Sequence, residues 1–124
     1  MERKNRSNFK MGTVEMIILF LLSQKDMYGY QLTTLINSLS EGDFPITEST
    51  LYPTLYKLLD KGYISDYERP GSKRKIRVYY RLEEDGKNRL SDLLEDYAKI
   101  TVGIERIMNA RFDSREELDN ENDR

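Results

Sequence analysis

The sequence contains no cysteine, no histidine and no tryptophan among its 124 residues. Without cysteine the chain has no disulfide, no thiolate ligand for zinc and no cysteine nucleophile. Without histidine it also lacks the imidazole group that most often serves as general base. The clustered acidic residues, Glu83–Asp85 and Glu116–Glu117, fall at a predicted helix start and in a polar tail, where they are typical of solvated charge. We therefore predict a protein that is not an enzyme and that needs no cofactor or metal ion.

Long apolar segments are equally scarce. The only one, Val14–Leu22, is shorter than the roughly 20 residues that cross a bilayer. It also lacks the small-residue cleavage site of a secretory signal. We interpret it as a buried helix and expect a cytoplasmic protein.

The net charge of −2 conceals an uneven distribution. Residues 1–81 carry 13 Lys and Arg against 9 Asp and Glu, whereas residues 82–124 carry 7 against 13. Such asymmetry between halves is more informative than the total. The first part of the chain has the basic character of a protein that binds a polyanion.

Three helices are predicted in the first half of the chain. The nearly continuous apolar stretch within 11–23 indicates a buried helix, and apolar residues spaced by three and four indicate a second helix over Tyr28–Leu39. The third, Thr47–Lys61, has Thr47 as a predicted N-cap and Gly62 as its stop. Pro53 lies inside this third helix, where we expect an irregularity because proline lacks a backbone donor.

A β-hairpin should follow the third helix. Tyr63–Glu68 is rich in strand-forming residues, and Ile76–Leu82 alternates strictly between apolar and polar positions. The segment between them, 69–75, holds a Pro-Gly pair and four Lys and Arg residues. These features predict a hairpin whose turn, at Pro70–Gly71, has a strongly basic tip.

The last long segment, Glu84–Met108, has a heptad pattern typical of a helix that pairs with a second helix. The composition, 38% hydrophobic and 34% charged, also suits a chain that completes its core by self-association. The residues predicted to hold a dimer together are Leu90, Leu93, Leu94, Tyr97, Ile100, Ile104 and Ile107.

Together these elements predict a mainly α fold with a small β-hairpin (α+β): a winged helix-turn-helix domain followed by a dimerisation helix. The expected divisions are a flexible basic arm over 1–9, the winged domain over 10–82, the dimerisation helix over 83–110 and an acidic, disordered tail over 111–124.

In helix-turn-helix proteins the second helix of the motif enters the major groove of DNA, and the basic hairpin suits phosphate contacts. The residues that we predict to contact double-stranded DNA are Thr47, Ser49, Thr50, Tyr52, Pro53, Tyr56, Lys57, Arg69, Lys73, Arg74, Lys75 and Arg77. An alternative is a winged helix that docks proteins and does not read DNA sequence. The six Lys and Arg between Arg69 and Arg81 favour DNA.

Four segments in order resemble the PadR family of transcriptional regulators: Tyr28–Leu32, Thr50–Leu55, Lys61–Ile64, and Arg77–Leu82 followed by Asp85-Gly86. The similarity covers roughly residues 11–108, and the single C-terminal helix resembles the smaller, drug-responsive branch of the family. The chain departs from the family pattern at Leu82–Glu84, where members more often have a capping threonine, and in having no tryptophan.

The resemblance implies a homodimeric repressor on a palindromic operator, released by a small hydrophobic or phenolic ligand. By position, it implies a ligand site lined by Met11, Val14, Glu15, Tyr97, Ile100 and Thr101. The alternative for Tyr97 is a dimer-core residue whose hydroxyl meets water at the edge of the interface.

Overall fold

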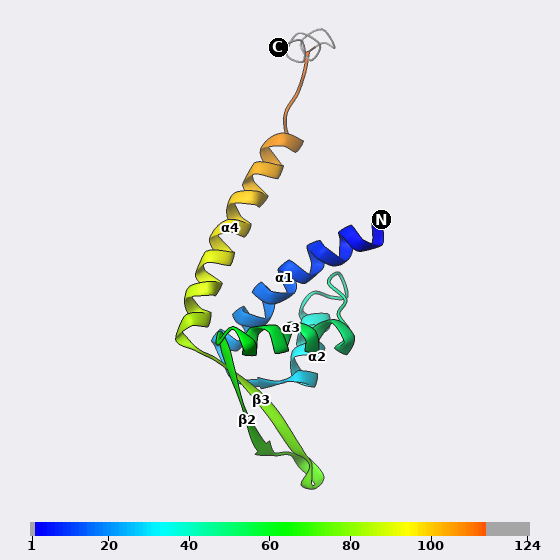
Figure 1. Cartoon of the computed structure of the whole chain (residues 1–124). Coiled ribbons are helices and arrows are strands. Elements are labelled where there is room, and N and C mark those ends of the chain that lie inside the picture. Colours follow the sequence, from blue (N-terminus) through cyan, green and yellow to red (C-terminus); the bar gives the residue numbers. More distant parts are fainter. Residues whose placement is uncertain (1, 114–124) are drawn as a thin grey trace. The chain divides into compact units, whose positions relative to one another are not determined.

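The computed structural model describes residues 2–113, with side chains from residue 12 onward. Over these residues the fold consists of four α-helices and a three-stranded antiparallel sheet (Figure 1). In chain order the elements are α1 (Glu2–Gln24), β1 (Met27–Tyr28), α2 (Gly29–Leu39), α3 (Glu48–Asp60), β2 (Ile64–Pro70), the 3₁₀ turn η1 (Ser72–Arg74), β3 (Ile76–Leu82) and α4 (Glu84–Met108). The predicted α+β class is confirmed.

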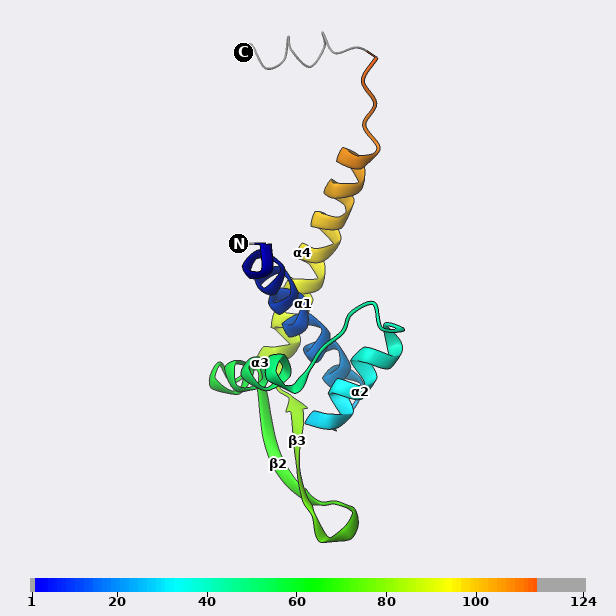
Figure 2. The same cartoon turned by 90° about the vertical axis from the view of Figure 1, so that its right-hand side faces the viewer.

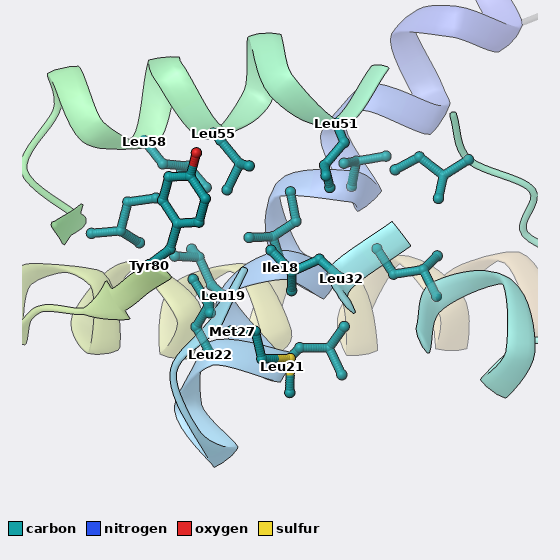
Figure 3. Close-up of a cluster of buried hydrophobic side chains, with 14 of the residues drawn as sticks. Ile18, Leu19, Leu21, Leu22, Met27, Leu32, Leu51, Leu55, Leu58 and Tyr80 are labelled. Carbon is teal, nitrogen blue, oxygen red and sulfur yellow. The ribbon is translucent and has the colours of Figure 1, made fainter. Parts of the chain in front are cut away.

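The hydrophobic core lies where α1, α2 and α3 meet the base of the sheet. α1 contributes Ile18 and Leu19, α2 contributes Leu32, and α3 contributes Leu55 and Leu58, all fully buried. Figure 3 shows these side chains gathered in one cluster with the ring of Tyr80, which reaches from β3 toward α3. Burial of so many branched side chains from three helices fixes the position of α3 relative to the sheet.

Both ends of α3 fall where the sequence predicts them, although the start is made differently. Thr47 occupies the N-cap position without a side-chain capping bond, because its Oγ1 lies 2.7 Å from the Ser49 hydroxyl instead. At the other end Gly62 adopts a φ of 75°, and the N–H of Tyr63 donates to the Leu58 carbonyl. This pairing is a Schellman motif, which requires a residue such as glycine in the left-handed conformation.

The sheet has the order β1-β3-β2, so that β3 is central. β2 and β3 pair from Ile64↔Leu82 at the base to Pro70↔Ile76 at the far end. The hairpin extends away from α1, α2 and α3 in both views (Figures 1 and 2). β1 was not predicted, because two residues are too few to show alternation. Tyr28 was instead placed at the start of the second predicted helix.

The first turns of α4 pack onto the same core as α1–α3. Gly86 is buried so close to the Tyr63 carbonyl that a β-carbon would overlap it, and Leu90 is only 8% exposed. Compact packing accordingly ends at Leu93, and a second unit begins at Leu94 within the same helix. The compact unit therefore includes the first turns of α4, whereas the expected division at 82/83 follows the start of that helix. Leu90, predicted at the dimer interface, belongs instead to the core of its own chain, a distinction that heptad spacing cannot make.

Helix α1 begins at Glu2, where the sequence predicted a flexible arm. Residues 2–10 contain no proline or glycine, so nothing in them ends a helix that is already nucleated downstream. The predicted acidic tail lies outside the described residues from residue 114 onward. None of the helices in the described part of the chain combines the length and apolar composition that a membrane-spanning segment requires.

Candidate nucleic-acid interface

The outer face of α3 carries five of the predicted DNA-contacting residues in exposed positions. These are Thr47, Ser49, Pro53, Tyr56 and Lys57, with Tyr56 61% exposed. The opposite face is the buried leucine row of the core, so the helix is held rigidly while its polar face stays open. Such a face, with hydroxyls near the helix start and a cation further along, suits base and phosphate contacts.

Pro53 does not interrupt α3, contrary to the predicted irregularity. The helix is continuous over Glu48–Asp60, and Pro53 lies on its exposed side. The next residue, buried Thr54, donates its hydroxyl to the Thr50 carbonyl at 3.1 Å. Thr50 is half-buried, so its position leaves it less available to DNA than its neighbours Ser49 and Pro53.

The hairpin tip presents its cations to solvent. Lys73, Arg74 and Lys75 are exposed, as is Arg69 on β2. The chain reverses through η1, where Lys73 and Arg74 have φ values of 56° and 64°. The sequence placed this turn at Pro70–Gly71, but Pro70 is still paired in β2 opposite Ile76. The basic tip is thus a separate loop beyond the strands, which agrees with its predicted exposure.

One face of the sheet is an alternating layer of tyrosine rings and guanidinium groups. The guanidinium carbon of Arg77 lies 4.4 Å from the centre of the Tyr28 ring, and that of Arg69 lies 4.8 Å from the centre of the Tyr79 ring. Tyr28 meets Tyr79 edge-on at 5.4 Å. Arg77 is half-buried by these contacts. Its charge therefore stays close to the sheet, whereas the charges of the tip are free to reach outward.

A cavity of about 470 Å³ opens between α3, the start of α2 and the inner face of the hairpin. Lys75 and Arg77 line it together with five tyrosines, Tyr28, Tyr30, Tyr52, Tyr56 and Tyr80. Burial is the main cause that raises the pKa of Tyr80 to about 12, and burial together with nearby Glu48 also raises the pKa of Tyr52. Both hydroxyls are therefore protonated at neutral pH and can donate hydrogen bonds.

Three of these tyrosines, Tyr28, Tyr30 and Tyr80, were missed as site residues. The available signal was the abundance of tyrosine, nine in all. Tyr52 was predicted to face DNA from α3, but the structure places it half-buried, with its hydroxyl against Gly29 of α2. The sequence alone could not show that α2 and the hairpin meet at this tyrosine.

Most of the remaining predicted dimer residues are exposed in the single chain, from Leu94 at 41% to Ile107 at 73%. Tyr97, Ile100 and Ile104 lie between these values, and Leu93 is partly buried against the core.

The predicted ligand-site residues are placed differently from one another. Val14 is fully buried in the core, and Glu15, 6% exposed, pairs with Arg89. Tyr97 and Ile100 are exposed and Thr101 is half-buried, while the Met11 side chain is outside the described part of the chain. Two of the six side chains are thus already covered within one chain.

Three packed helices and a basic β-hairpin beside an exposed third helix define a winged helix-turn-helix protein of the class that regulates transcription. Residues 18–92 match the model of the "Transcriptional regulator PadR-like family". The chain belongs to this PadR-like family, as the four sequence segments indicated.

Relatives and solved structures agree with this assignment. A protein of Lysinibacillus sphaericus is 35% identical over 103 residues, which cover 83% of this chain and 94% of that protein. The crystal structure of smu.1704 from Streptococcus mutans matches with a TM-score of 0.72 and 33% identity, covering 84% of this chain and 93% of that one. Bacillus subtilis PadR in complex with operator DNA matches with a TM-score of 0.62 and 28% identity, covering 66% of this chain and 46% of that one.

Proposed function

We propose that this protein is a homodimeric repressor that binds a palindromic DNA operator in the cytoplasm. The observation that carries the proposal is the placement of the exposed polar face of α3 beside a hairpin whose tip holds three consecutive cations, Lys73–Lys75. The similarity to a PadR protein whose structure contains operator DNA supports the same function. In this proposal α3 enters the major groove and the hairpin grips the phosphate backbone.

Each surface has a distinct role in the proposal. Ser49, Tyr56 and Lys57 on α3 contact base edges and the adjacent backbone, which gives sequence preference. The cations of the tip neutralise phosphates without regard to sequence, which gives salt-dependent affinity. The net acidity of residues 82–124 keeps the remainder of the chain from competing for the same polyanion.

Dimerisation rests on the apolar row that α4 leaves exposed. Leu94, Tyr97, Ile100, Ile104 and Ile107 recur at heptad spacing over four turns, all at least 41% exposed. A polar protein seldom leaves such a row uncovered, and a second copy of the helix offers a matching row. Two-fold symmetry of the dimer then implies two half-sites about one helical turn apart.

Release by a small hydrophobic or phenolic ligand is the finer part of the proposal and rests on the family resemblance. Because Val14 and Glu15 are covered within one chain, the ligand would contact chiefly Tyr97, Ile100 and Thr101. DNA binding does not depend on this ligand, so the two parts can be tested separately.

The proposal is tested by selecting genomic DNA fragments with wild-type protein and with Tyr56→Ala and Lys57→Ala. Lys87→Ala, which changes an exposed cation on α4 and leaves α3 and the hairpin unaltered, is the control. Wild type and the control should enrich one palindromic site, whereas the α3 variants should lose or change that preference. Identical enrichment by all four proteins would contradict the role of α3, and the absence of any enriched site would contradict the repressor.

A further inference from the structure

The start of α2 is an uncapped helix end that faces the tyrosine-lined cavity. Tyr28 holds the N-cap position without a side-chain capping bond, and the first turn has no acidic residue. The first backbone N–H groups of a helix have no partner within the helix, and together with the helix dipole they attract anions. Tyr28, Gly29 and Tyr30 all line the cavity, so this helix end opens into it.

The Tyr52 hydroxyl lies beside the same helix end. A β-carbon on Gly29 would overlap the Tyr52 hydroxyl and would lie 2.8 Å from the adjoining ring carbon. Glycine at position 29 is therefore what allows the α3 hydroxyl to approach the α2 backbone. Burial and the neighbouring Glu48 carboxylate both raise the pKa of Tyr52, so that its hydroxyl stays protonated and can act as a donor.

Tyr80 provides an independent indication that the cavity takes a polar ligand. It is only 4% exposed, and it lines the cavity. Within the part of the chain that the structure describes, its hydroxyl makes no hydrogen bond, and the hydroxyl oxygen is not among the buried polar atoms although the ring is buried. A hydroxyl that is accessible at the end of a buried ring is suited to an external acceptor.

The charges around the cavity select an anion. Lys75 is exposed at the end of the hairpin, and Arg77 lines the wall near Tyr28. The nearby acidic groups are Glu48 on the first turn of α3 and Asp66 on β2 opposite Tyr80, and both are exposed to solvent. Two cations, a helix N-terminus and two hydroxyl donors outweigh these two screened carboxylates.

We propose that this cavity clamps one DNA backbone phosphate in each half-site, held by the first-turn N–H groups of α2 and the hydroxyls of Tyr52 and Tyr80, while Lys75 adds electrostatic attraction from the rim of the cavity. The inference rests on the proposed function and deepens it, because it assigns α2 and the inner face of the hairpin to the interface. In this inference Tyr52 contacts a backbone phosphate and does not contact a base. A clamp between α3 and the hairpin would fix the depth at which α3 enters the groove.

The test measures affinity for the selected operator by fluorescence anisotropy, using wild type, Tyr52→Phe, Tyr80→Phe and Tyr63→Phe. Each change removes one hydroxyl and keeps the ring, and Tyr63 is a control because it does not line the cavity. Loss of a hydrogen bond to a charged acceptor should weaken binding roughly tenfold for Tyr52→Phe and Tyr80→Phe, on operator and on unrelated DNA alike. Circular dichroism and thermal melting establish that each variant is folded.

A second arm locates the phosphate. Operators with a single neutral methylphosphonate at successive backbone positions are titrated with the same proteins. At one position per half-site the neutral linkage should weaken wild type and Tyr63→Phe about tenfold but weaken Tyr52→Phe distinctly less, because the hydrogen-bond donor is already absent there.

The outcomes separate the two proposals. Unchanged affinity of Tyr52→Phe, or additive losses at every phosphate, would overturn the clamp while leaving the repressor intact. No binding of DNA by wild type would overturn both. If inorganic phosphate shifts the amide resonances of Tyr30 and Gln31 while the methylphosphonate scan is flat, the site takes free phosphate and the assignment to DNA is wrong.

Discussion

Nε of Arg89 in α4 donates a hydrogen bond of 2.9 Å to Oε1 of Glu15 in α1, across 74 residues of sequence. The Glu15 side chain is only 7% exposed, and that of Arg89 is 37% exposed. This bond is the principal cause that raises the pKa of Arg89. The pair therefore ties the first turns of α4 to the domain that carries the candidate DNA interface.

Arg89→Met should lower the free energy of unfolding by about 2 kcal/mol, because it leaves the Glu15 carboxylate buried without its partner. The double change Glu15→Leu with Arg89→Met should recover much of that loss, since it removes the unpaired charge. Lys87→Met, which breaks an exposed pair with Glu84 in the same helix, should change stability by less than about 0.5 kcal/mol. Urea titration measures all three, and equal losses from Arg89→Met and Lys87→Met would contradict this role.

Gly86→Ala should destabilise the protein by about 2 kcal/mol or more, because its β-carbon would overlap the Tyr63 carbonyl and the α4 start would have to shift. Gly12→Ala is the matched control: it is also in a helix, but nothing lies within 4 Å of its β-carbon. There we expect a gain of roughly 0.5–1 kcal/mol from helix propensity. If the melting temperature of Gly86→Ala equals or exceeds that of wild type, the start of α4 is not held by this contact.

The elements that depend on local sequence patterns could be predicted from the sequence. The α4 bounds, the β3 bounds and the α3 stop at Gly62 follow from periodicity and a glycine signal, and the structure has them at the predicted positions. Features that depend on contacts between residues far apart in the sequence could not be predicted. The two-residue strand β1, which exists only because Tyr28 pairs with Tyr79, is one such feature.

The residues of the candidate site also fall into a group that the sequence could predict and a group that it could not. The exposed α3 residues and the cations of the tip were predictable because exposure and charge are visible in the sequence. The partial burial of Tyr52 and Arg77 was not, because each depends on packing against the Tyr28–Gly29 segment of another element. Leu90 was misassigned for a related reason: heptad spacing identifies an apolar row but not which chain covers it.

Burial of Tyr80 makes the free energy of unfolding decrease at alkaline pH. Burial raises its pKa from 10.0 to about 12, so the folded state retains a proton that the unfolded state has lost. This contribution is fully present below pH 10 and is lost as pH rises toward 12. In a tyrosinate absorbance titration of the folded protein, Tyr80→Phe should remove a tyrosine that ionises near pH 12. Loss of one that ionises near the ordinary value would contradict its burial.

Ile100→Asp should convert the proposed dimer to monomers in light scattering, because it places a charge in the exposed apolar row of α4. Lys99→Asp introduces the same side chain one residue earlier, about 100° around the helix from Ile100. It breaks only an exposed pair with Glu95 and should leave the dimer intact. An Ile100→Asp protein that remains dimeric would place the interface elsewhere.

The most direct test of DNA binding by this winged helix is fluorescence anisotropy of the selected operator and a scrambled duplex, titrated across salt concentration. Wild type should prefer the operator at least about a thousandfold and lose affinity steeply with salt. Lys73→Ala with Arg74→Ala and Lys75→Ala should weaken binding to both duplexes and reduce the salt slope by roughly one for each phosphate that is no longer neutralised. Equal, weak affinity of wild type for both duplexes, with a slope that the triple change leaves unaltered, would contradict sequence-specific DNA binding by this protein.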